Sequence, residues 1–273
     1  SQSGETVDTL GAMAQVRNEW KAPQVTVCNV VDAESTRIAQ GSAIYLRGGP
    51  EIGVASTKTF TCSMAALYLL ACQIGIARGY LRGAKLQTAL DALLTVPTLV
   101  DRMLAQSDLY QAVARDLRQV KNLLYLGRGL QYPIAMEGAL KLKEIAYVPC
   151  EAYAAGEMKH GPIALVEPNM FVLAIACEGP TYDEMVANIM EIKARSGPVI
   201  AVSYDGDEKI PQTGVDKDAD PSDVGARPND MIYVPPTEEL ISPITIGIPL
   251  QLLAYHMADL RGEDIDQPRN LAK

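Results

Sequence analysis

The segment AMEGALKLKEIAY places a lysine between two glutamates at helical spacing. Glu137 precedes Lys141 by four residues and Glu144 follows it by three, so a helix brings all three to one side. A solvated ladder of opposite charges is the simpler interpretation of this spacing. The alternative is a carboxylate held near a lysine in a cleft, an arrangement that tunes a general base. The spacing alone leaves both interpretations open.

The two histidines of the chain lie in different contexts. His160 lies in EMKHGP, bounded by Gly and Pro, with Glu157 and Lys159 beside it and no apolar helical face around it. It is therefore a candidate acid or base, and the alternative is a hydrogen-bonding role within a loop. His256 lies in LLAYHMADL, where we expect a packed helix residue.

The C-terminal segment GEDIDQPRNLAK is polar, contains Pro268 and ends on Lys273. Such a segment is most simply a frayed terminus. A lysine carried by a flexible segment over a closed site would instead form a Schiff base with a carbonyl compound, provided that desolvation favours the neutral amine. A lysine permits this chemistry, but the sequence alone does not decide between the two interpretations of Lys273.

Hydroxyl side chains crowd the opening segment SQSGETVDTL. Ser1, Ser3 and Thr6 surround Gly4, just before a pattern that predicts a helix to about Trp20 with Ser3 as its cap. The free N–H groups and the positive end of a helix attract an anion, so the segment is typical of a phosphate-binding turn. Such a turn normally follows a strand, and none precedes Ser1 in the sequence.

Strand and helix patterns alternate along most of the chain. This alternation predicts parallel sheets with helices on both faces, a Rossmann-like three-layer α/β fold. Segment 151–162 reads as a loop, and the acidic, Pro- and Gly-rich segment 206–229 reads as an exposed mobile loop. Strands are predicted at 24–30, 42–48, 122–129, 171–177, 198–205 and 231–236, and helices at 3–20, 56–79, 84–105, 107–119, 133–147, 181–197 and 242–260.

The order of elements in the first half repeats in the second half. The first half has no counterpart of residues 122–177, so the first domain is expected to be incomplete at its N-terminus. We expect a first domain at 1–105, a second at 106–260 and a tail at 261–273.

Composition narrows the classes of partner. The chain has 273 residues, 48% of them hydrophobic, and 24 Lys and Arg against 33 Asp and Glu, a net charge of -9. No basic cluster suits nucleic acid, and the apolar stretch AALYLLACQIGIA is short for a membrane span. The five cysteines are odd in number, lie in apolar contexts and lack the paired spacing of a metal site, which favours reduced thiols. We therefore expect a soluble, cytoplasmic protein.

Five motifs together resemble the isomerase half of the glutamine:fructose-6-phosphate aminotransferase family, which is built from two sugar isomerase (SIS) domains. They are SQSGETVDTL, EIGVASTK, LGRGLQYPIAMEGALKLKEIAY, EAYAAGEMKHGP and DQPRNLAK, in order from Ser1 to Lys273. The resemblance implies two SIS domains, the first incomplete, acting in amino-sugar biosynthesis toward UDP-N-acetylglucosamine. It implies a sugar phosphate, fructose 6-phosphate or glucosamine 6-phosphate, as ligand and neither a metal nor an organic cofactor.

The resemblance also implies a role for each matching residue. Glu144 matches the carboxylate that moves a proton between C1 and C2, and Lys141 matches another active-site residue. His160 matches a ring-opening acid or base that comes from the partner subunit of a homodimer, and Lys273 matches the lysine that forms the imine. The positions that match sugar-phosphate contacts are Ser1, Gln2, Ser3, Thr6, Val54, Ser56 and Ala272.

The sequence departs from the family pattern at two places. The Cys-Gly-Thr-Ser phosphate loop of the first SIS domain is absent, and so is the glutamine-hydrolysing domain that we expect upstream in the full-length chain. Two other readings stay open. One is a stand-alone SIS deaminase or deglycase acting on an amino-sugar phosphate, and the other is a non-catalytic sugar-phosphate-binding SIS module.

Overall fold

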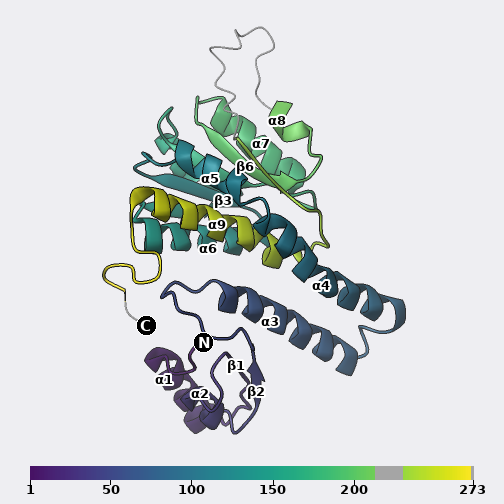
Figure 1. The fold of residues 1–273 in the computed structure, drawn as a ribbon. Helices are drawn as coiled ribbons and strands as arrows, with labels where there is room; N and C mark the ends of the chain where they lie inside the picture. Colours follow the sequence, from purple (N-terminus) through teal and green to yellow (C-terminus); the bar gives the residue numbers. More distant parts are fainter. Residues whose placement is uncertain (213–229, 272–273) are drawn as a thin grey trace. The chain divides into compact units, whose positions relative to one another are not determined.

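The computed structural model describes residues 1–212 and 230–271. The chain forms two compact units, Ser1–Leu93 and Leu94–Lys273, and the division falls within helix α4 (Gly83–Leu104) (Figure 1). Most of the predicted loop 206–229 lies outside the described residues. The domain limits derived from the sequence stay predictions.

The first unit contains a two-stranded parallel sheet. Strands β1 and β2 pair with Thr26 opposite Ala43 and Cys28 opposite Tyr45. The short helix α2 forms in the polar stretch between the two predicted strands, where the sequence pattern indicates no helix. The elements are α1 (Val7–Gln15), the π-helical turn η1 (Val16–Trp20), β1 (Thr26–Cys28), α2 (Glu34–Ile38), β2 (Ala43–Tyr45), α3 (Lys58–Ala77) and the first part of α4.

Helix α3 keeps much of its apolar surface exposed. Leu67, Leu69 and Ile74 are about half exposed. Among the helices of the described residues, α3 is the one long and apolar enough to cross a membrane by length and composition, with a mean hydropathy of 1.7 over its best window. Core helices of soluble proteins pass the same test, so one such helix is weak evidence.

The second unit is built on a five-stranded parallel sheet with strand order β4-β3-β5-β6-β7. Strand β3 pairs with β4 on one side and β5 on the other, so that Leu123 lies opposite both Cys150 and Phe171. The predicted parallel α/β sheet is thus confirmed for this unit. Its strands are β3 (Leu123–Gly127), β4 (Cys150–Ala154), β5 (Phe171–Ile175), β6 (Val199–Tyr204) and β7 (Met231–Val234).

Strand β4 corrects the sequence prediction. All of it but Cys150 lies within the segment expected to be a loop, and the two 3-10 turns η2 (Ala155–His160) and η3 (Pro162–Leu165) follow it. As an edge strand β4 has neighbours on one side, and of its residues Cys150 alone is fully buried. A strand with so little apolar alternation gives a weak signal in sequence.

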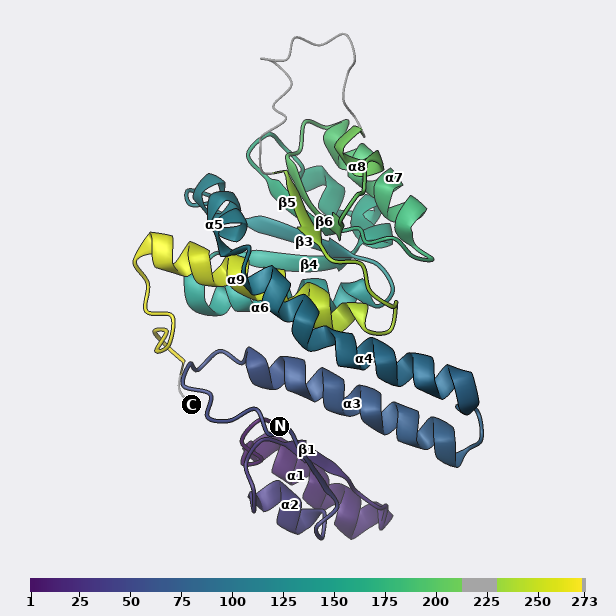
Figure 2. The same ribbon diagram turned by 45° about the vertical axis from the view of Figure 1, so that its right-hand side comes forward.

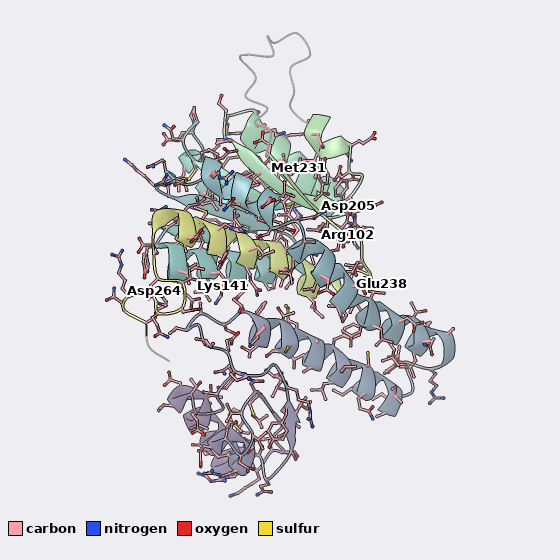
Figure 3. The ribbon with its side chains drawn as sticks, in the orientation of Figure 1. Arg102, Lys141, Asp205, Met231, Glu238 and Asp264 are labelled. Atoms are coloured by element: carbon pink, nitrogen blue, oxygen red, sulfur yellow. The ribbon has the colours of Figure 1, made fainter. Side chains whose placement is uncertain are left out.

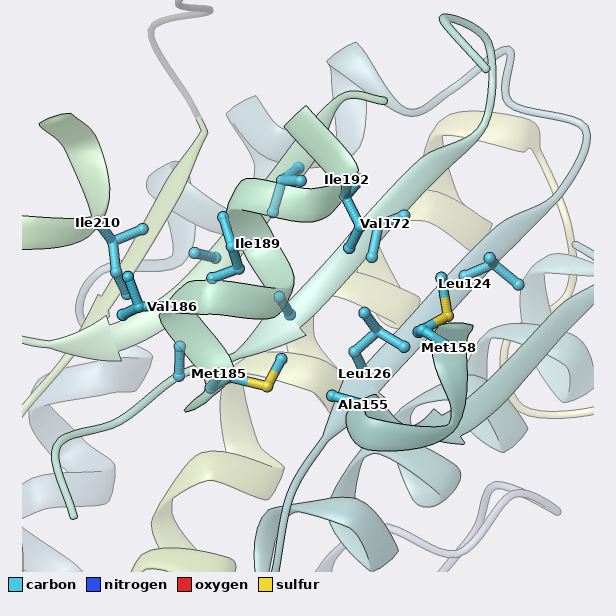
Figure 4. Close-up of a cluster of buried hydrophobic side chains, with 14 of the residues drawn as sticks. Leu124, Leu126, Ala155, Met158, Val172, Met185, Val186, Ile189, Ile192 and Ile210 are labelled. Carbon is cyan, nitrogen blue, oxygen red and sulfur yellow. The ribbon is translucent and has the colours of Figure 1, made fainter. Parts of the chain in front are cut away.

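Helices cover both faces of this sheet (Figures 1 and 2). Helices α6 and α9 pack together on one face, and α5 packs on α9. On the other face, Leu126 of β3, Met158 of η2 and Ile189 of α7 belong to one buried apolar cluster (Figure 4). The helices are α5 (Ser107–Asp116), α6 (Gln131–Ala146), α7 (Tyr182–Lys193), α8 (Lys209–Gln212) and α9 (Ser242–Arg261).

Candidate functional site

Lys141 is a buried cation held between two carboxylates on α6. Its side chain is 4% exposed, and its Nζ atom lies 2.6 Å from Glu144 Oε2 and 3.4 Å from Glu137 Oε1. The three residues lie on one side of the helix, as their spacing predicts. The interpretation as a solvated ladder is wrong, because an exposed ladder would leave the lysine in water. Figure 3 labels Lys141 on α6.

Close packing fixes the helix that carries these residues. Gly138 lies where α6 approaches α9 and β3, and a Cβ atom there would lie 2.8 Å from Leu250 Cδ1 and 3.0 Å from Tyr125 Cε1. A larger residue would push α6 outward. The glycine therefore sets the depth at which Lys141, one turn later, is buried.

Burial also shifts the pKa of Glu137 in this cluster. Desolvation raises the pKa of Glu137 above its ordinary value of 4.5, while the charge of Lys141 and its hydrogen bond oppose the rise. Glu144 is more exposed than Glu137, with 23% of its side chain accessible. A carboxylate that reaches solvent beside a buried cation can accept and return a proton, as a general base must.

The C-terminal segment returns to the same end of α6. Leu140, Glu144 and Tyr147 line a hollow of about 450 Å³ together with Asn270 and Leu271 of this segment. The backbone N–H of Arg269 donates a hydrogen bond of 2.7 Å to the hydroxyl of Tyr147, and the guanidinium lies 4.2 Å from the centre of its ring. The described part of the C-terminal segment, up to Leu271, thus lies at the hollow beside Glu144. Ala272 and Lys273 themselves lie outside the described residues.

Tyr147 ends α6 in an unusual backbone conformation. Its φ of 53° and ψ of 35° are left-handed, a conformation that glycine adopts at many helix ends. For a residue with a Cβ atom this conformation costs about 1–2 kcal/mol. Sequence analysis did not single out Tyr147 or Arg269, and an aromatic residue at the last position of a predicted helix is the one signal it could have used.

His160 does not join this cluster within one chain. It ends η2, which follows β4 and packs with α7 on the face of the sheet opposite to α6. Strands β3 and β4 are parallel, so α6 must run from the C-terminal end of β3 back to the N-terminal end of β4. Glu144, near the end of α6, therefore lies by the N-terminal ends of the strands, whereas His160 follows the C-terminal end of β4. His160 is exposed there and is available to another molecule.

In the first unit the hydroxyl-rich turn is held by backbone hydrogen bonds. The carbonyl of Gln2 accepts from Asn29 N–H at 2.9 Å and that of Gly4 accepts from Ser35 N–H at 3.0 Å. Gly4 has a φ of 72°, and a Cβ atom there would lie 2.5 Å from Ala33 Cβ, so glycine is required. The turn therefore has a defined place beside β1 and α2.

The hydroxyls of this turn make contacts that differ from the prediction in one respect. Ser1 Oγ lies 2.9 Å from Thr6 Oγ1 and accepts Gly4 N–H at 3.1 Å. Ser3 accepts the N–H of Glu5 at 3.1 Å and does not cap α1, so the cap predicted there is wrong. Thr6 is the N-cap residue and makes no side-chain cap bond in the described structure. The first-turn N–H groups of α1 remain available to an anion.

The segment EIGVAST, which carries Val54 and Ser56, leads into α3. Glu51 accepts Thr57 N–H at 2.9 Å and Thr59 N–H at 3.2 Å, and Ser56 Oγ lies 2.8 Å from Thr59 Oγ1. Ser56 thus faces the start of α3, and Val54 is half-buried.

A hollow of about 590 Å³ in the first unit brings part of the predicted phosphate site together. Gln2, Asn29, Arg47 and Glu51 are among its lining residues. Asn29 also fixes the loop after β2, because its side chain bonds Gly48 N–H and the carbonyl of Gly49. The sequence analysis missed Asn29 and Arg47, for which a polar residue near the C-terminal end of a predicted strand was the available signal.

His256 has the packing role that the sequence predicts. It is 7% exposed, and its Nε2 lies 2.9 Å from Ser107 Oγ, which joins α9 to α5. Burial lowers the pKa of His256, and the charges of Asp259 and Asp108 oppose this. The described residues include no group of three His, Cys, Asp or Glu side chains placed to hold a metal ion, and the five cysteines are free.

Residues 116–261 match the SIS domain family. The chain is 45% identical over all 273 residues to "Glutamine--fructose-6-phosphate aminotransferase [isomerizing]" of Thermus thermophilus and spans 42% of that protein's length. Among solved structures, the "C-terminal domain of glucosamine-fructose-6-phosphate aminotransferase" from Francisella tularensis has a TM-score of 0.87 and 34% identity, covering 97% of this chain and 71% of that one.

A glucosamine-6-phosphate deaminase structure from Thermotoga maritima is also similar. It has a TM-score of 0.72 and 20% identity, and the match covers 100% of this chain and 72% of that one. At this identity the likeness supports the α/β fold alone.

Proposed function

Because the chain belongs to the SIS domain family and is homologous over its length to the C-terminal domain of glutamine–fructose-6-phosphate aminotransferases, we propose that it is the isomerase part of such an enzyme. Its substrate would be fructose 6-phosphate and its product glucosamine 6-phosphate. The chain spans 42% of the length of the Thermus relative, so the nitrogen source is assigned to an upstream glutamine-hydrolysing domain.

The proposed chemistry divides among the residues named from the sequence. Ser1, Gln2, Ser3 and Thr6 bind the phosphate through hydroxyl, amide and helix-end N–H groups. The amine of Lys273 adds to the C2 carbonyl with loss of water, and ammonia then displaces the lysine from the imine. These two steps need no metal.

Proton transfer follows imine formation. Glu144 removes a proton from C1 and returns a proton to C2, which converts the ketose derivative to the aldose. The ammonium of Lys141, 2.6 Å from Glu144, donates a charge-assisted hydrogen bond that orients the carboxylate.

The observation that carries this proposal is the burial of the Lys141 cation between two carboxylates, one of which reaches solvent. A lysine that is 4% exposed between two glutamates is costly as a purely structural device, because burying charges offsets much of their attraction. The hollow beside Glu144, lined by the segment that leads to Lys273, gives the arrangement a substrate-sized space.

The location of His160 supports a homodimer with a shared site. Within one chain His160 and Glu144 lie on opposite faces of the sheet and at opposite ends of its strands. If His160 opens the sugar ring, it must act on the site of a second copy, and an imidazole side chain can serve as the acid or base of this step. We also assign the protein to the cytoplasm and to the pathway toward UDP-N-acetylglucosamine, as the family resemblance implies.

The test is a product assay with the full-length protein that carries this chain. Fructose 6-phosphate with glutamine or ammonia should give glucosamine 6-phosphate, and fructose 6-phosphate alone should give glucose 6-phosphate. Release of ammonia from glucosamine 6-phosphate without synthesis would favour the deaminase reading. Binding of the sugar phosphate without any conversion would favour the non-catalytic module.

A further inference from the structure

Tyr147 holds the C-terminal segment through two separate contacts with one residue. Its hydroxyl accepts the backbone N–H of Arg269 at 2.7 Å, and its ring lies under the guanidinium of Arg269 at 4.2 Å. A single hydrogen bond would allow the segment to rotate about it. Contacts to both the backbone and the side chain of Arg269 fix its direction as well as its position.

Further contacts make the segment a rigid extension of this attachment. Asp264 Oδ1 accepts the N–H groups of Asp266 at 3.1 Å and Gln267 at 2.9 Å, which closes a turn after α9. Pro268 is buried, and its carbonyl accepts the N–H of Leu271. Figure 3 labels Asp264 on this segment. Asn270 and Leu271, which follow the contact with Tyr147, line the hollow.

The left-handed backbone conformation of Tyr147 would favour glycine, so the tyrosine side chain must have a role of its own at this position. At φ 53° and ψ 35° glycine would end α6 without steric strain. A bulky residue in this conformation points to a functional constraint at the position. The two contacts to Arg269 supply that constraint, because they require a ring with a hydroxyl group at this end of α6.

We propose that Tyr147 is a positioning residue that latches Arg269 and so holds the C-terminal segment against the Glu144 end of α6. The latch directs Asn270 and Leu271 into the wall of the hollow, and we expect it to raise the rate at which the lysine of the same segment forms the imine. The effect on imine formation rests on the proposed function. The contact between Tyr147 and Arg269 does not depend on it.

Trypsin cleavage after Arg269 tests the latch without any substrate. The bond can be cut when Arg269 leaves Tyr147, so the rate reports the unlatched fraction. Tyr147→Phe keeps the ring and removes the hydroxyl acceptor, and it should speed this cleavage about fivefold, the effect of losing one ordinary hydrogen bond. Tyr132→Phe, the same change at the other end of α6, is the matched control.

Borohydride trapping of fructose 6-phosphate tests the positioning role in the same variants. The amine of Lys273 and the C2 carbonyl form a C=N bond with loss of water, and borohydride hydride reduces it to a stable secondary amine. Tyr147→Phe should slow trapping about fivefold at saturating sugar phosphate and leave the affinity for the sugar phosphate unchanged, as a positioning effect requires. A general loss of structure would change both.

The outcomes separate the latch from the proposed function. Faster cleavage with slower trapping in Tyr147→Phe, and neither in Tyr132→Phe, supports the proposal. Unchanged cleavage overturns the latch. Faster cleavage with unchanged trapping overturns the positioning role. If the unaltered protein traps no sugar, the imine chemistry and the positioning role fail together, while the cleavage rates still decide whether the latch exists.

Discussion

The Nζ atom of Lys141 lies 2.6 Å from Glu144 Oε2 while the lysine side chain is 4% exposed. This relationship joins the packing of α6 to its chemistry. Gly138 permits the close approach that buries the lysine, and the buried lysine holds a partly exposed carboxylate beside the hollow. The stability of α6 and the acid–base behaviour of the site should therefore respond together to changes at these residues.

Removing the buried cation should destabilise the second unit. Lys141→Met leaves Glu137 and Glu144 without their counter-ion and should lower the free energy of unfolding by about 2 kcal/mol near neutral pH, less than for a fully buried pair because both glutamates keep some solvent contact. Lys143→Met, an exposed change on the same helix, should alter it by less than about 0.5 kcal/mol. Equal effects in urea unfolding would contradict the buried pair.

The same change should alter the pH dependence of stability. Because the pKa of Glu137 is raised above 4.5, the folded state binds more protons than the unfolded state and stability falls as pH rises through the window above that value. Lys141 opposes this rise, so Lys141→Met should raise the pKa further and steepen the fall. Unfolding measured from pH 4 to 8 checks the slope, and a slope no steeper than in the unaltered protein would count against it.

Two glycines in helices should respond oppositely to the same substitution. Gly138→Ala places a methyl group 2.8 Å from Leu250 Cδ1 and should cost about 1–3 kcal/mol of stability. Gly11→Ala in α1 meets no atom within 4 Å and should stabilise by about 0.4–1 kcal/mol. Thermal unfolding measures both, and a neutral Gly138→Ala would show that α6 and α9 have room to separate.

Asp207 should stabilise the end of β6 in a pH-dependent way. Burial alone would raise its pKa, but hydrogen bonds from Ser203, Tyr182 and the N–H groups of Ile210 and Lys209 outweigh this and lower it. Its contribution is therefore present above its ordinary value of 3.8 and is lost as pH falls through the lowered pKa.

Asp207→Asn tests this contribution. We expect a loss of about 1–3 kcal/mol at pH 7 and a flatter loss of stability toward acid pH, because the amide cannot accept all four bonds. Glu184→Gln, an exposed change on α7, is the control. Acid unfolding curves that coincide for Asp207→Asn and the unaltered protein would refute the assignment.

The shared site makes a complementation prediction. Glu144→Gln and His160→Asn should each inactivate a homodimer, but mixed dimers carry one site with both native residues. Random mixing should restore about a quarter of the native activity, since half of the dimers are mixed and one of their two sites is intact. Activity is measured after subunits exchange. No recovery, with exchange confirmed by mass spectrometry, would place both residues in the site of one chain.

The fold was largely predictable because most of its elements have strong periodic patterns. Strand β6 is buried along its whole length and α9 is apolar on nearly all sides, which gives uninterrupted hydrophobic runs. Strand β4 was missed because an edge strand with one fully buried residue has neither a continuous run nor a regular alternation. The cap at Ser3 was wrong because its hydroxyl bonds the nearer N–H of Glu5.

The candidate site was predictable only in part. Spacing placed Glu137, Lys141 and Glu144 on one side of a helix, but it could not show that this side is buried, because burial depends on the approach of α9 at Gly138. The contact of Tyr147 with Arg269 joins residues more than a hundred positions apart, which local patterns do not encode. The role of Lys273 stays a prediction, because that residue lies outside the described structure.

The most direct test of the central claim is exchange of the C1 proton of fructose 6-phosphate in deuterium oxide, followed by NMR. If Glu144 is the base, the unaltered protein should introduce deuterium from solvent, and Glu144→Gln should reduce the exchange rate at least about a hundredfold at unchanged affinity for the sugar phosphate. Glu184→Gln should exchange at the native rate. Exchange by Glu144→Gln at the rate of the unaltered protein would contradict the account.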